Sequence, residues 1–169
     1  MLREGMAMSI VKDPGVALQE MVDRAAIEDL FVRYFSGLGG GDPDWFGQFF
    51  AEGAELDVNG IVNFGREDIG NLYRAVTEDK PNLIGTFRMI LSNLLIDIDG
   101  DKATARAMWT QTINESIKGP PRFIEQGWEV DALERIDGQW KITKRVVTAD
   151  SNLPDMMDDT YTPRPDYKL

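Results

Sequence analysis

Two carboxylates, Glu129 and Asp131, have the clearest potential for chemistry in this sequence. They stand two positions apart in the run Arg122 to Ile136, whose β-type alternation directs both side chains to one face. Two carboxylates this close raise the pKa of one of them, which makes a general acid without histidine. The chain has no histidine and no cysteine, and this excludes imidazole bases, Ser-His-Asp triads, disulfides and thiolate metal sites. Acid–base chemistry must therefore use carboxylates, tyrosines, lysines or arginines.

Two other interpretations of this carboxylate pair remain open. An ion pair with Arg33, Arg88 or Arg135 would make the pair structural, because a buried carboxylate needs a partner. A β-bulge would instead change the register and expose both side chains to solvent. The sequence thus predicts either a proton-transfer group or an ion pair on this strand.

Large flat side chains form a second group of candidates. Trp109 shares a strand face with the alanines of the run Ala103 to Ile117, where small residues leave room that one ring can close. Together with Trp45, Trp128 and Met89 it predicts a flat-walled pocket for aromatic or polycyclic ligands. A plain aromatic core is the alternative for each of these residues.

Composition and charge exclude several classes of function. The 169 residues fit one domain, and the net charge of −11 disfavours nucleic acid and anionic membrane surfaces. No stretch reaches the roughly 18 apolar residues of a membrane span, and the N-terminus has no apolar block typical of a secretory signal. The acidic stretch 155–159 lacks the spacing of a calcium loop, and the glycines 39–41 lack a phosphate-binding lysine. We expect a cytoplasmic protein without metal or cofactor.

The elements that must position these residues form a helical first half and a β-rich second half. We expect a flexible arm at 1–17, a single domain at 18–150 and an acidic, proline-containing tail at 151–169. Helices are predicted at 18–38, from Asp42 as N-cap, and at 66–76. Strands are predicted at 54–58, 61–64, 84–98, 103–117, 122–136 and 140–148, with tight turns at Asn59-Gly60 and Asp137-Gly138. This order predicts an α+β fold with helices on one face of an antiparallel sheet.

The first predicted helix has a buried stripe that repeats every four residues. The residues of this stripe are Val22, Ala26, Leu30, Tyr34 and Leu38, widened by Ile27, Phe31 and Phe35. A tyrosine on such a stripe needs a partner for its hydroxyl, and a bound substrate or a neighbouring core group can supply it.

Four segments in this order resemble the SnoaL-like branch of the NTF2-like superfamily. The segments are Arg24–Leu30 with Arg33-Tyr34, Gly41–Asp44 with Phe49–Ala51, Ser92-Asn93 with Ile98–Ala105, and Gly127–Arg135 with Asp137–Ile142. The resemblance covers about Val22 to Asp150. It implies a cone-shaped α+β barrel of the NTF2-like or cystatin-like type. In such a barrel a curved antiparallel sheet wraps around about three N-terminal helices, with an apolar pocket at the wide end. Many members pair sheet to sheet, so we expect a homodimer.

The resemblance also implies a class of activity. The branch contains dehydratases, isomerases, cyclases, lyases and non-catalytic binding proteins, so the fold alone does not define the reaction. Many dehydratase relatives use an aspartate–histidine dyad, whose positions fall near Gly39 and at Met89 or Arg88 here, so the dyad is absent unless Asp42 shifts into place. We therefore expect a cofactor-independent lyase or isomerase that eliminates water or cleaves a C–C bond in a small hydrophobic, aromatic substrate. A small-molecule-binding or assembly protein is the alternative.

The family comparison adds further candidate site residues. Tyr34 matches an oxyanion-stabilising donor of ketosteroid isomerase relatives, and Asp57 lies one residue from their base, although a solvated strand face also explains it. Leu133 shares a strand face with the carboxylate pair and matches a core position of the family, so the pair should face the cone; relatives usually carry an aromatic residue where Glu129 stands. Asn93 matches a recurrent position that binds a ligand or ties sheet to helix, and Arg88 reaches the pocket only with a bulge. The expected catalytic residues are Tyr34, Asp57, Glu129 and Asp131, and the expected substrate-binding residues are Trp45, Arg88, Met89, Asn93, Trp109 and Trp128.

Overall fold

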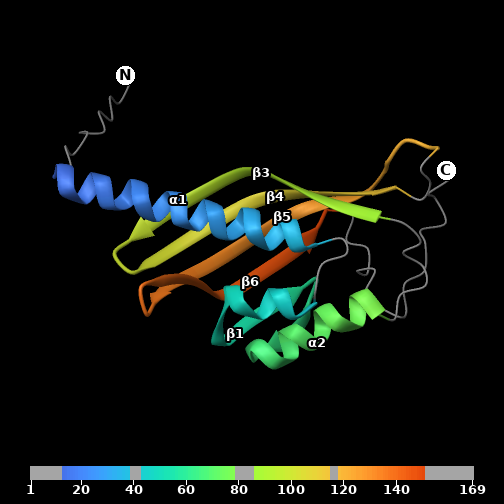
Figure 1. Ribbon diagram of the computed structural model, residues 1–169, viewed down its shortest axis with the longest axis horizontal. Helices are drawn as coiled ribbons and strands as arrows, with labels where there is room; N and C mark the ends of the chain where they lie inside the picture. Colours follow the sequence, from blue (N-terminus) through green and yellow to red (C-terminus); the bar gives the residue numbers. More distant parts are fainter. Residues whose placement is uncertain (1–12, 39–42, 79–85, 115–117, 151–169) are drawn as a thin grey trace, which may run out of the picture.

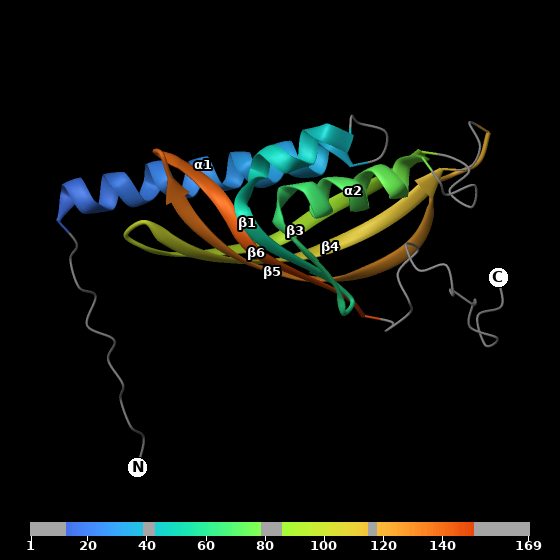
Figure 2. The ribbon, with the colours of Figure 1, turned by 90° about the horizontal axis from the view of Figure 1, so that it is seen from below.

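The structure is a computed structural model that describes residues 13–38, 43–78, 86–114 and 118–150. The elements along the chain are α1 (Pro14–Gly37), η1 (Pro43–Phe49), β1 (Phe50–Val58), β2 (Ile61–Phe64), α2 (Gly65–Glu78), β3 (Thr86–Asp99), β4 (Lys102–Asn114), β5 (Arg122–Ile136) and β6 (Gln139–Ala149). The helices cover the concave face of a curved sheet, and none of the described helices lies on its convex face (Figure 1, Figure 2). The predicted glycine run, the Asp42 cap and the acidic tail lie outside the described residues.

The sheet has the strand order β2-β1-β6-β5-β4-β3. The long strands β3 to β6 form consecutive antiparallel pairs, as their hairpin turns predict. β1 pairs in parallel with β6, so the sheet is mixed and not wholly antiparallel. A parallel neighbour needs a long crossover, which α2 and the strands β3 to β5 supply. The predicted α+β class with a curved sheet around N-terminal helices is confirmed.

The two short hairpins have the turns that their sequences predict. Asn59 and Gly60 have φ angles of 52° and 90°, and Asp137 and Gly138 have φ angles of 50° and 77°. Positive φ at both central residues is the requirement of the type I′ turn, which Asn-Gly and Asp-Gly favour. These turns hold β1 against β2 and β5 against β6.

The helix α1 differs from its prediction at both its start and its buried stripe. It begins at Pro14, where Asp13 caps it by accepting a hydrogen bond from the Gly15 amide at 2.8 Å, so residues 14–17 of the predicted arm are helical. Asp23 is buried, whereas Val22 is 55% exposed. On a helix with 3.6 residues per turn, residues spaced four positions apart rotate by about 40° around the axis at each step. A row of such residues therefore moves off the buried face. The buried residues of α1 are Asp23, Ile27, Leu30, Phe31 and Tyr34.

The second predicted helix is the short 3-10 helix η1 and not an α-helix. Phe46 and Phe49 are three residues apart and both are buried. The 3-10 geometry places residues i and i+3 above one another, so this helix can bury both rings over a short length. In the described part of the chain, no helix has the length and apolarity needed to cross a membrane.

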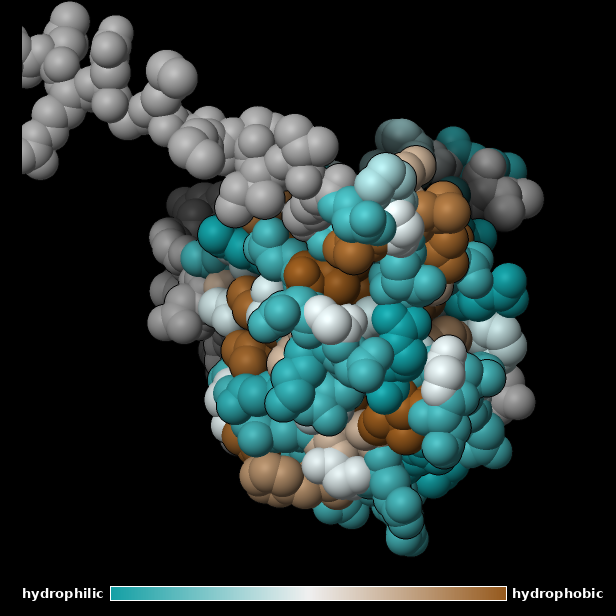
Figure 3. All heavy atoms as spheres, turned by 90° about the vertical axis from the view of Figure 1, so that its left-hand side faces the viewer, coloured by the Kyte–Doolittle hydropathy of each residue, from teal (hydrophilic) through white to brown (hydrophobic). Residues whose placement is uncertain are grey.

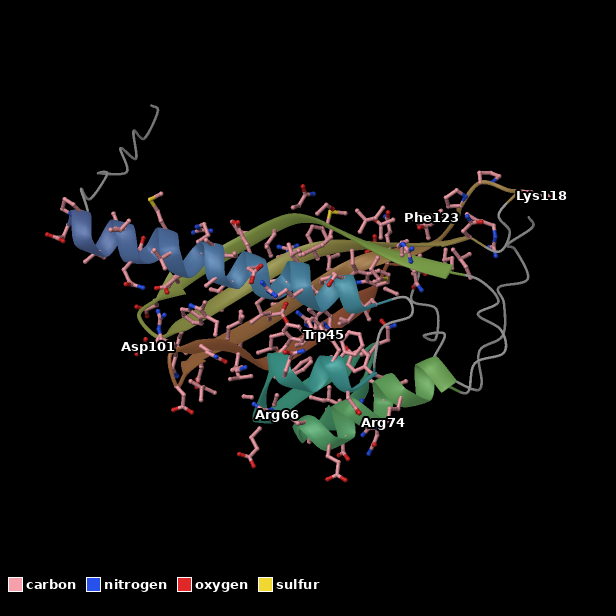
Figure 4. All side chains as sticks on the ribbon, in the orientation of Figure 1. Trp45, Arg66, Arg74, Asp101, Lys118 and Phe123 are labelled. Atoms are coloured by element: carbon pink, nitrogen blue, oxygen red, sulfur yellow. The ribbon has the colours of Figure 1, made fainter. Side chains whose placement is uncertain are left out.

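Asp23 joins α1 to the last hairpin. Its carboxylate accepts two hydrogen bonds from Arg135, at 2.8 and 2.7 Å, and one from the Trp140 indole at 3.3 Å. Arg135 also donates to Asp101 at the β3–β4 turn, which Figure 4 labels at one end of the sheet. The hydrogen bonds from Arg135 lower the pKa of Asp23. Asp101 lies on the side of the molecule that faces the viewer in Figure 3, where hydrophilic side chains cover most of the surface and apolar ones form smaller patches.

We expect Asp23→Asn to lower the free energy of unfolding at pH 7 by about 1.5–3 kcal/mol, because the buried Arg135 hydrogen bonds lose their charged acceptor. A lowered pKa stabilises the fold above the unfolded value near 4, and this contribution is lost as pH falls through the folded value. Urea unfolding at pH 7 measures the loss of stability in the variant, and urea unfolding in acid measures how far the Asp23 contribution to the wild type disappears. The control Asp29→Asn removes the exposed pair with Arg33 and should change stability little. Equal effects of the two variants would contradict the prediction.

Candidate functional site

Three charged side chains are buried together on the concave face of the sheet. Glu129 and Asp131 of β5 are 2% and 1% exposed, and Arg145 of β6 is 0% exposed. The Arg145 Nε donates to Asp131 Oδ1 at 2.6 Å, and the Arg145 Nη2 lies 3.4 Å from Glu129 Oε1. We call these three residues the charged cluster. Both carboxylates thus face the inside of the cone.

The arginine of this cluster is not one of the three partners predicted from sequence. Arg33 pairs with Asp29 on the exposed side of α1, and Arg135 binds Asp23 and Asp101. Arg88 is exposed on β3. The carboxylate pair therefore forms an ion pair, but with Arg145.

A β-bulge in β6 brings Arg145 to the concave face. Leu133 is the register partner of Ile142, and Ala132 is the partner of Lys144, so β6 contains one extra residue at this point. The extra residue reverses the alternation, and Arg145 comes directly opposite Asp131. Continued alternation from the buried Ile142 would have directed Arg145 to the convex face. The sequence shows no local signal for this bulge.

Aromatic rings surround the Arg145 guanidinium. Its Cζ lies 4.1 Å from the ring centroid of Tyr34 and 5.3, 5.8 and 6.0 Å from the centroids of Phe31, Phe50 and Phe35. The Tyr34 hydroxyl forms a hydrogen bond with the Tyr73 hydroxyl of α2. Tyr73 in turn stacks on Phe46, with centroids 4.1 Å apart. The rings keep the charged cluster away from water and strengthen its electrostatic interactions.

The cluster holds a proton at neutral pH. Burial raises the pKa of Glu129 to about 8; the Arg145 charge opposes this rise, and the charge and hydrogen bonding of Asp131 add to it. Burial also raises the pKa of Asp131, but its ion pair with Arg145 and its hydrogen bond with Glu129 favour the charged form. Arg145 lies closer to Asp131 than to Glu129, so its charge favours the ionised form of Asp131 over that of Glu129. Burial raises the pKa of Tyr34 to about 12, so this hydroxyl stays protonated.

Several polar atoms of the cluster have no hydrogen-bond partner within the described residues. These atoms are Glu129 Oε1, Asp131 Oδ2, Arg145 Nη1 and Arg145 Nη2. In the same part of the chain, Asn63 Nδ2 is the one other buried side-chain atom in this condition. Buried polar groups in proteins are nearly always satisfied, so a concentration of unsatisfied ones indicates an additional polar guest.

A groove of about 890 Å³ lies beside the cluster, between α1 and β3. Its lining includes Phe31 and Phe35 of α1 and three of the predicted binding residues, Arg88, Met89 and Asn93 of β3. Arg88 and Met89 are consecutive strand residues and point to opposite faces of the sheet. Both border the groove because β3 is the edge strand of the sheet. Neither carboxylate of the cluster lines the groove. Phe31 and Phe35 belong to both sites and separate them.

The structure does not bring Met89 and the three predicted tryptophans into one pocket. Trp45 packs at the end of α1, donates to the Arg33 carbonyl at 3.1 Å, and contacts Phe49 edge to face (Figure 4). Trp109 is buried on the concave face and donates to the Trp128 carbonyl at 3.2 Å. The Trp128 ring lies under the Arg106 guanidinium, 4.3 Å from it, on the convex face.

Asp57 and Asn93 lie apart from the charged cluster. Asp57 Oδ1 accepts from the Gly60 amide at 2.7 Å, so this carboxylate holds the β1–β2 turn. Asn93 follows a register shift in β3, has a φ of 53°, and donates to the Met108 sulfur at 3.2 Å. Of the four predicted catalytic residues, Tyr34, Glu129 and Asp131 therefore come together. Among the described residues no group of three or more acidic side chains could hold a metal ion.

This arrangement of a curved sheet, covering helices and an enclosed polar centre agrees with the family comparison. Residues 19–146 match the family model of the SnoaL-like domain. The chain belongs to the SnoaL-like domain family. No curated protein matches it.

Several solved structures share the fold of this SnoaL-like protein. A protein of unknown function from Mycobacterium tuberculosis is 25% identical, with a TM-score of 0.70 over 79% of this chain and 75% of that one. A scytalone dehydratase candidate from Novosphingobium aromaticivorans is 20% identical, with a TM-score of 0.67 over 79% and 87%. ActVI-ORFA from Streptomyces coelicolor is 18% identical, with a TM-score of 0.67 over 76% and 98%. The family and fold fit a role in processing small molecules.

Proposed function

We propose that this SnoaL-like protein is a cofactor-independent lyase or isomerase that moves a proton on a small hydrophobic, aromatic substrate. The observation that carries the proposal is the burial of the Glu129 carboxyl group, 2% exposed beside Asp131 and Arg145, which raises its pKa to about 8. A general acid works best when its pKa lies near the operating pH. The aromatic class of substrate follows from the Phe31 and Phe35 rings that line the groove beside it.

Elimination of water illustrates how one carboxyl group can complete such a reaction. Glu129 gives its proton to the departing hydroxyl group, which leaves as water. The resulting carboxylate takes the proton from the neighbouring carbon, and the electron pair of that C–H bond becomes part of the new C=C bond. Glu129 is protonated again at the end of the cycle. In an isomerisation, the carboxylate would remove a proton from one carbon, and the resulting carboxyl group would donate it to another.

The Tyr34 and Tyr73 hydroxyls would assist by hydrogen bonding. The two hydroxyls form a hydrogen bond with each other, and the Tyr34 hydroxyl would exchange this bond for one to a substrate oxygen. Because burial raises the pKa of Tyr34 to about 12, this hydroxyl remains protonated throughout the neutral range. Such a donor stabilises negative charge that develops in a transition state.

Turnover of a panel of phenolic and polyketide-like compounds, followed by chromatography in the presence of a chelator, tests the proposal. We expect at least one compound to lose water or to isomerise at the same rate with and without the chelator. Loss of turnover on chelation would contradict the metal-free chemistry. Absence of turnover with every compound would favour the alternative.

The alternative is a small-molecule-binding protein that uses the same fold. The observation that favours it is the lining of the groove, which contains neither Glu129 nor Asp131. A ligand that stays in the groove would not touch the charged cluster. A crystal structure with a bound aromatic ligand distinguishes the two functions by the distance from the ligand to Glu129.

We also propose a homodimer that forms through the convex face of the sheet. Leu95, Arg106 and Val130 are direct register neighbours on β3, β4 and β5, and Leu95 and Val130 are 59% and 48% exposed. Val146 continues this row on β6. An open sheet face with apolar side chains commonly binds a partner.

Light scattering should therefore give twice the mass of one chain at micromolar concentration, and Val130→Glu should shift the protein toward the monomer. The buried charges in the mutated interface would repel each other, since a two-fold axis places the same patch on both subunits. Val32→Glu, on the exposed side of α1, is the matched control and should leave the mass unchanged. A monomeric wild type at this concentration would contradict the dimer.

A further inference from the structure

We propose that Arg145 binds the substrate through a carbonyl or phenolate oxygen, which accepts hydrogen bonds from the two Nη atoms of its guanidinium. The inference rests on the proposed function and defines its substrate class as aromatic ketones and phenols. It assigns to Arg145 a role that the interaction with Asp131 alone does not require.

The hydrogen bonding of Arg145 is the first observation. Asp131 binds the Nε edge at 2.6 Å; among the described residues Nη1 has no hydrogen-bond partner, and Nη2 has only the 3.4 Å contact with Glu129 Oε1. The guanidinium is 0% exposed, so surface water does not solvate these atoms. An arginine donates through a planar fork that fits one oxygen or two adjacent ones. The fork therefore points to an oxygen-bearing guest.

The charge of the cluster is the second observation. The titratable and charged groups around the guanidinium are Asp131 and Glu129 on β5, Tyr34 on α1 and, through its bond to Tyr34, Tyr73 on α2. Arg145 and Asp131 compensate each other, while burial raises the pKa of Glu129 to about 8 and that of Tyr34 to about 12, which favours their neutral forms at pH 7. A cluster without net charge whose arginine has unsatisfied Nη donors can accept an oxygen that carries partial or full negative charge.

The position of the groove is the third observation. Phe31 and Phe35 line the groove and also lie against the guanidinium, 5.3 and 6.0 Å from its Cζ. Phe31 is 0% exposed, whereas Phe35 is half-buried and is the more distant ring. An aromatic ligand in the groove would thus reach the Nη atoms when the Phe35 ring turns aside. Its oxygen substituent would point to Arg145 and its ring would remain among apolar side chains.

Binding of 4-nitrophenol tests the inference without any need for turnover. Its phenolate absorbs visible light and its neutral phenol does not, so a pH titration reports the pKa of the bound compound. We expect the wild-type protein to lower that pKa by about one unit or more, since Arg145 favours the phenolate. Arg145→Lys keeps the charge beside Asp131 but lacks the fork, and should weaken phenolate binding about tenfold or more. Neutral nitrobenzene should bind both proteins equally.

Arg33→Lys is the matched control, because this arginine forms an exposed ion pair on α1, and it should bind the phenolate like the wild type. If Arg145→Lys does not fold, Arg145→Gln combined with Asp131→Asn replaces the charges by neutral side chains of similar shape and should show the same loss. An unshifted pKa of bound 4-nitrophenol, no binding by the wild type, or equal phenolate affinity in a folded variant would overturn the inference. Turnover that depends on Glu129 would then still support the proposed function.

Discussion

Glu129→Gln is expected to lower turnover by at least ~100-fold while the protein stays folded, which is the effect of removing a general acid or base. Glutamine keeps the shape and hydrogen-bonding capacity of the side chain but cannot transfer a proton. The acid is the protonated form, so wild-type turnover should fall as pH rises through about 8, where Glu129 ionises. The remaining activity of the variant should lack this decline. Rate measurements from pH 6 to about 9.5 on both proteins compare the two profiles.

The same substitution has an expected effect on stability that separates proton transfer from a structural role. A carboxyl group whose folded pKa is raised stabilises the fold most below its unfolded value near 4, and this contribution is lost as pH rises through the folded value of about 8. Glu129→Gln should therefore melt at the wild-type temperature or above it near pH 8. Glu134→Gln, on the same strand in a partly exposed pair with Lys102, is the control and should preserve turnover. Intact turnover in Glu129→Gln would remove Glu129 from the mechanism.

Arg145→Gln is expected to lower the free energy of unfolding by about 3–5 kcal/mol, because it leaves the Asp131 carboxylate buried without a countercharge. Both side chains of this pair are inaccessible to solvent, so water cannot replace the lost interaction. Asp131→Asn in the same protein removes the uncompensated charge. The double variant should therefore recover most of the loss, and urea unfolding of the four proteins gives the coupling energy.

Arg33→Gln provides the matched control for this cycle. Its pair with Asp29 is exposed on both sides, and such pairs contribute about 0–1 kcal/mol. The control should thus unfold at nearly the wild-type urea concentration. If Arg145→Gln were equally harmless, the ion pair would not hold the charged cluster together, and Asp131 would not carry an uncompensated buried charge in the variant.

Local sequence patterns determined several features of this protein. Alternation placed Glu129 and Asp131 on one face with Leu133, and the structure has all three on the buried face. Asn-Gly and Asp-Gly dipeptides located two hairpin turns, because few other residues adopt positive φ at both central positions. The order of helices and strands defined the α+β class. Each of these features depends on interactions between residues that are near one another in the chain.

Tertiary structure alone decided the partners of the buried polar groups. Asp23 is inside because Arg135 and Trp140, more than a hundred positions later, donate to it, and a helical repeat cannot reveal such partners. The Tyr34 hydroxyl meets Tyr73 because α2 packs against the core. Gly37 allows the Trp45 ring to pack closely, since a Cβ there would lie 2.5 Å from the ring, and this directs Trp45 away from the charged cluster.

Arg145 shows most clearly which features local sequence determines and which depend on tertiary structure. Its strand is recognisable from sequence, but its direction depends on one extra residue in β6, which reverses the facing of every residue after it. The cross-strand pairing of β5 and β6 selects the position of that residue, and no pattern within β6 encodes it. The sequence by itself therefore determined that two carboxylates face the cone. Only the tertiary structure decided which cation they meet, because the side of a sheet on which a residue lies is a property of paired strands.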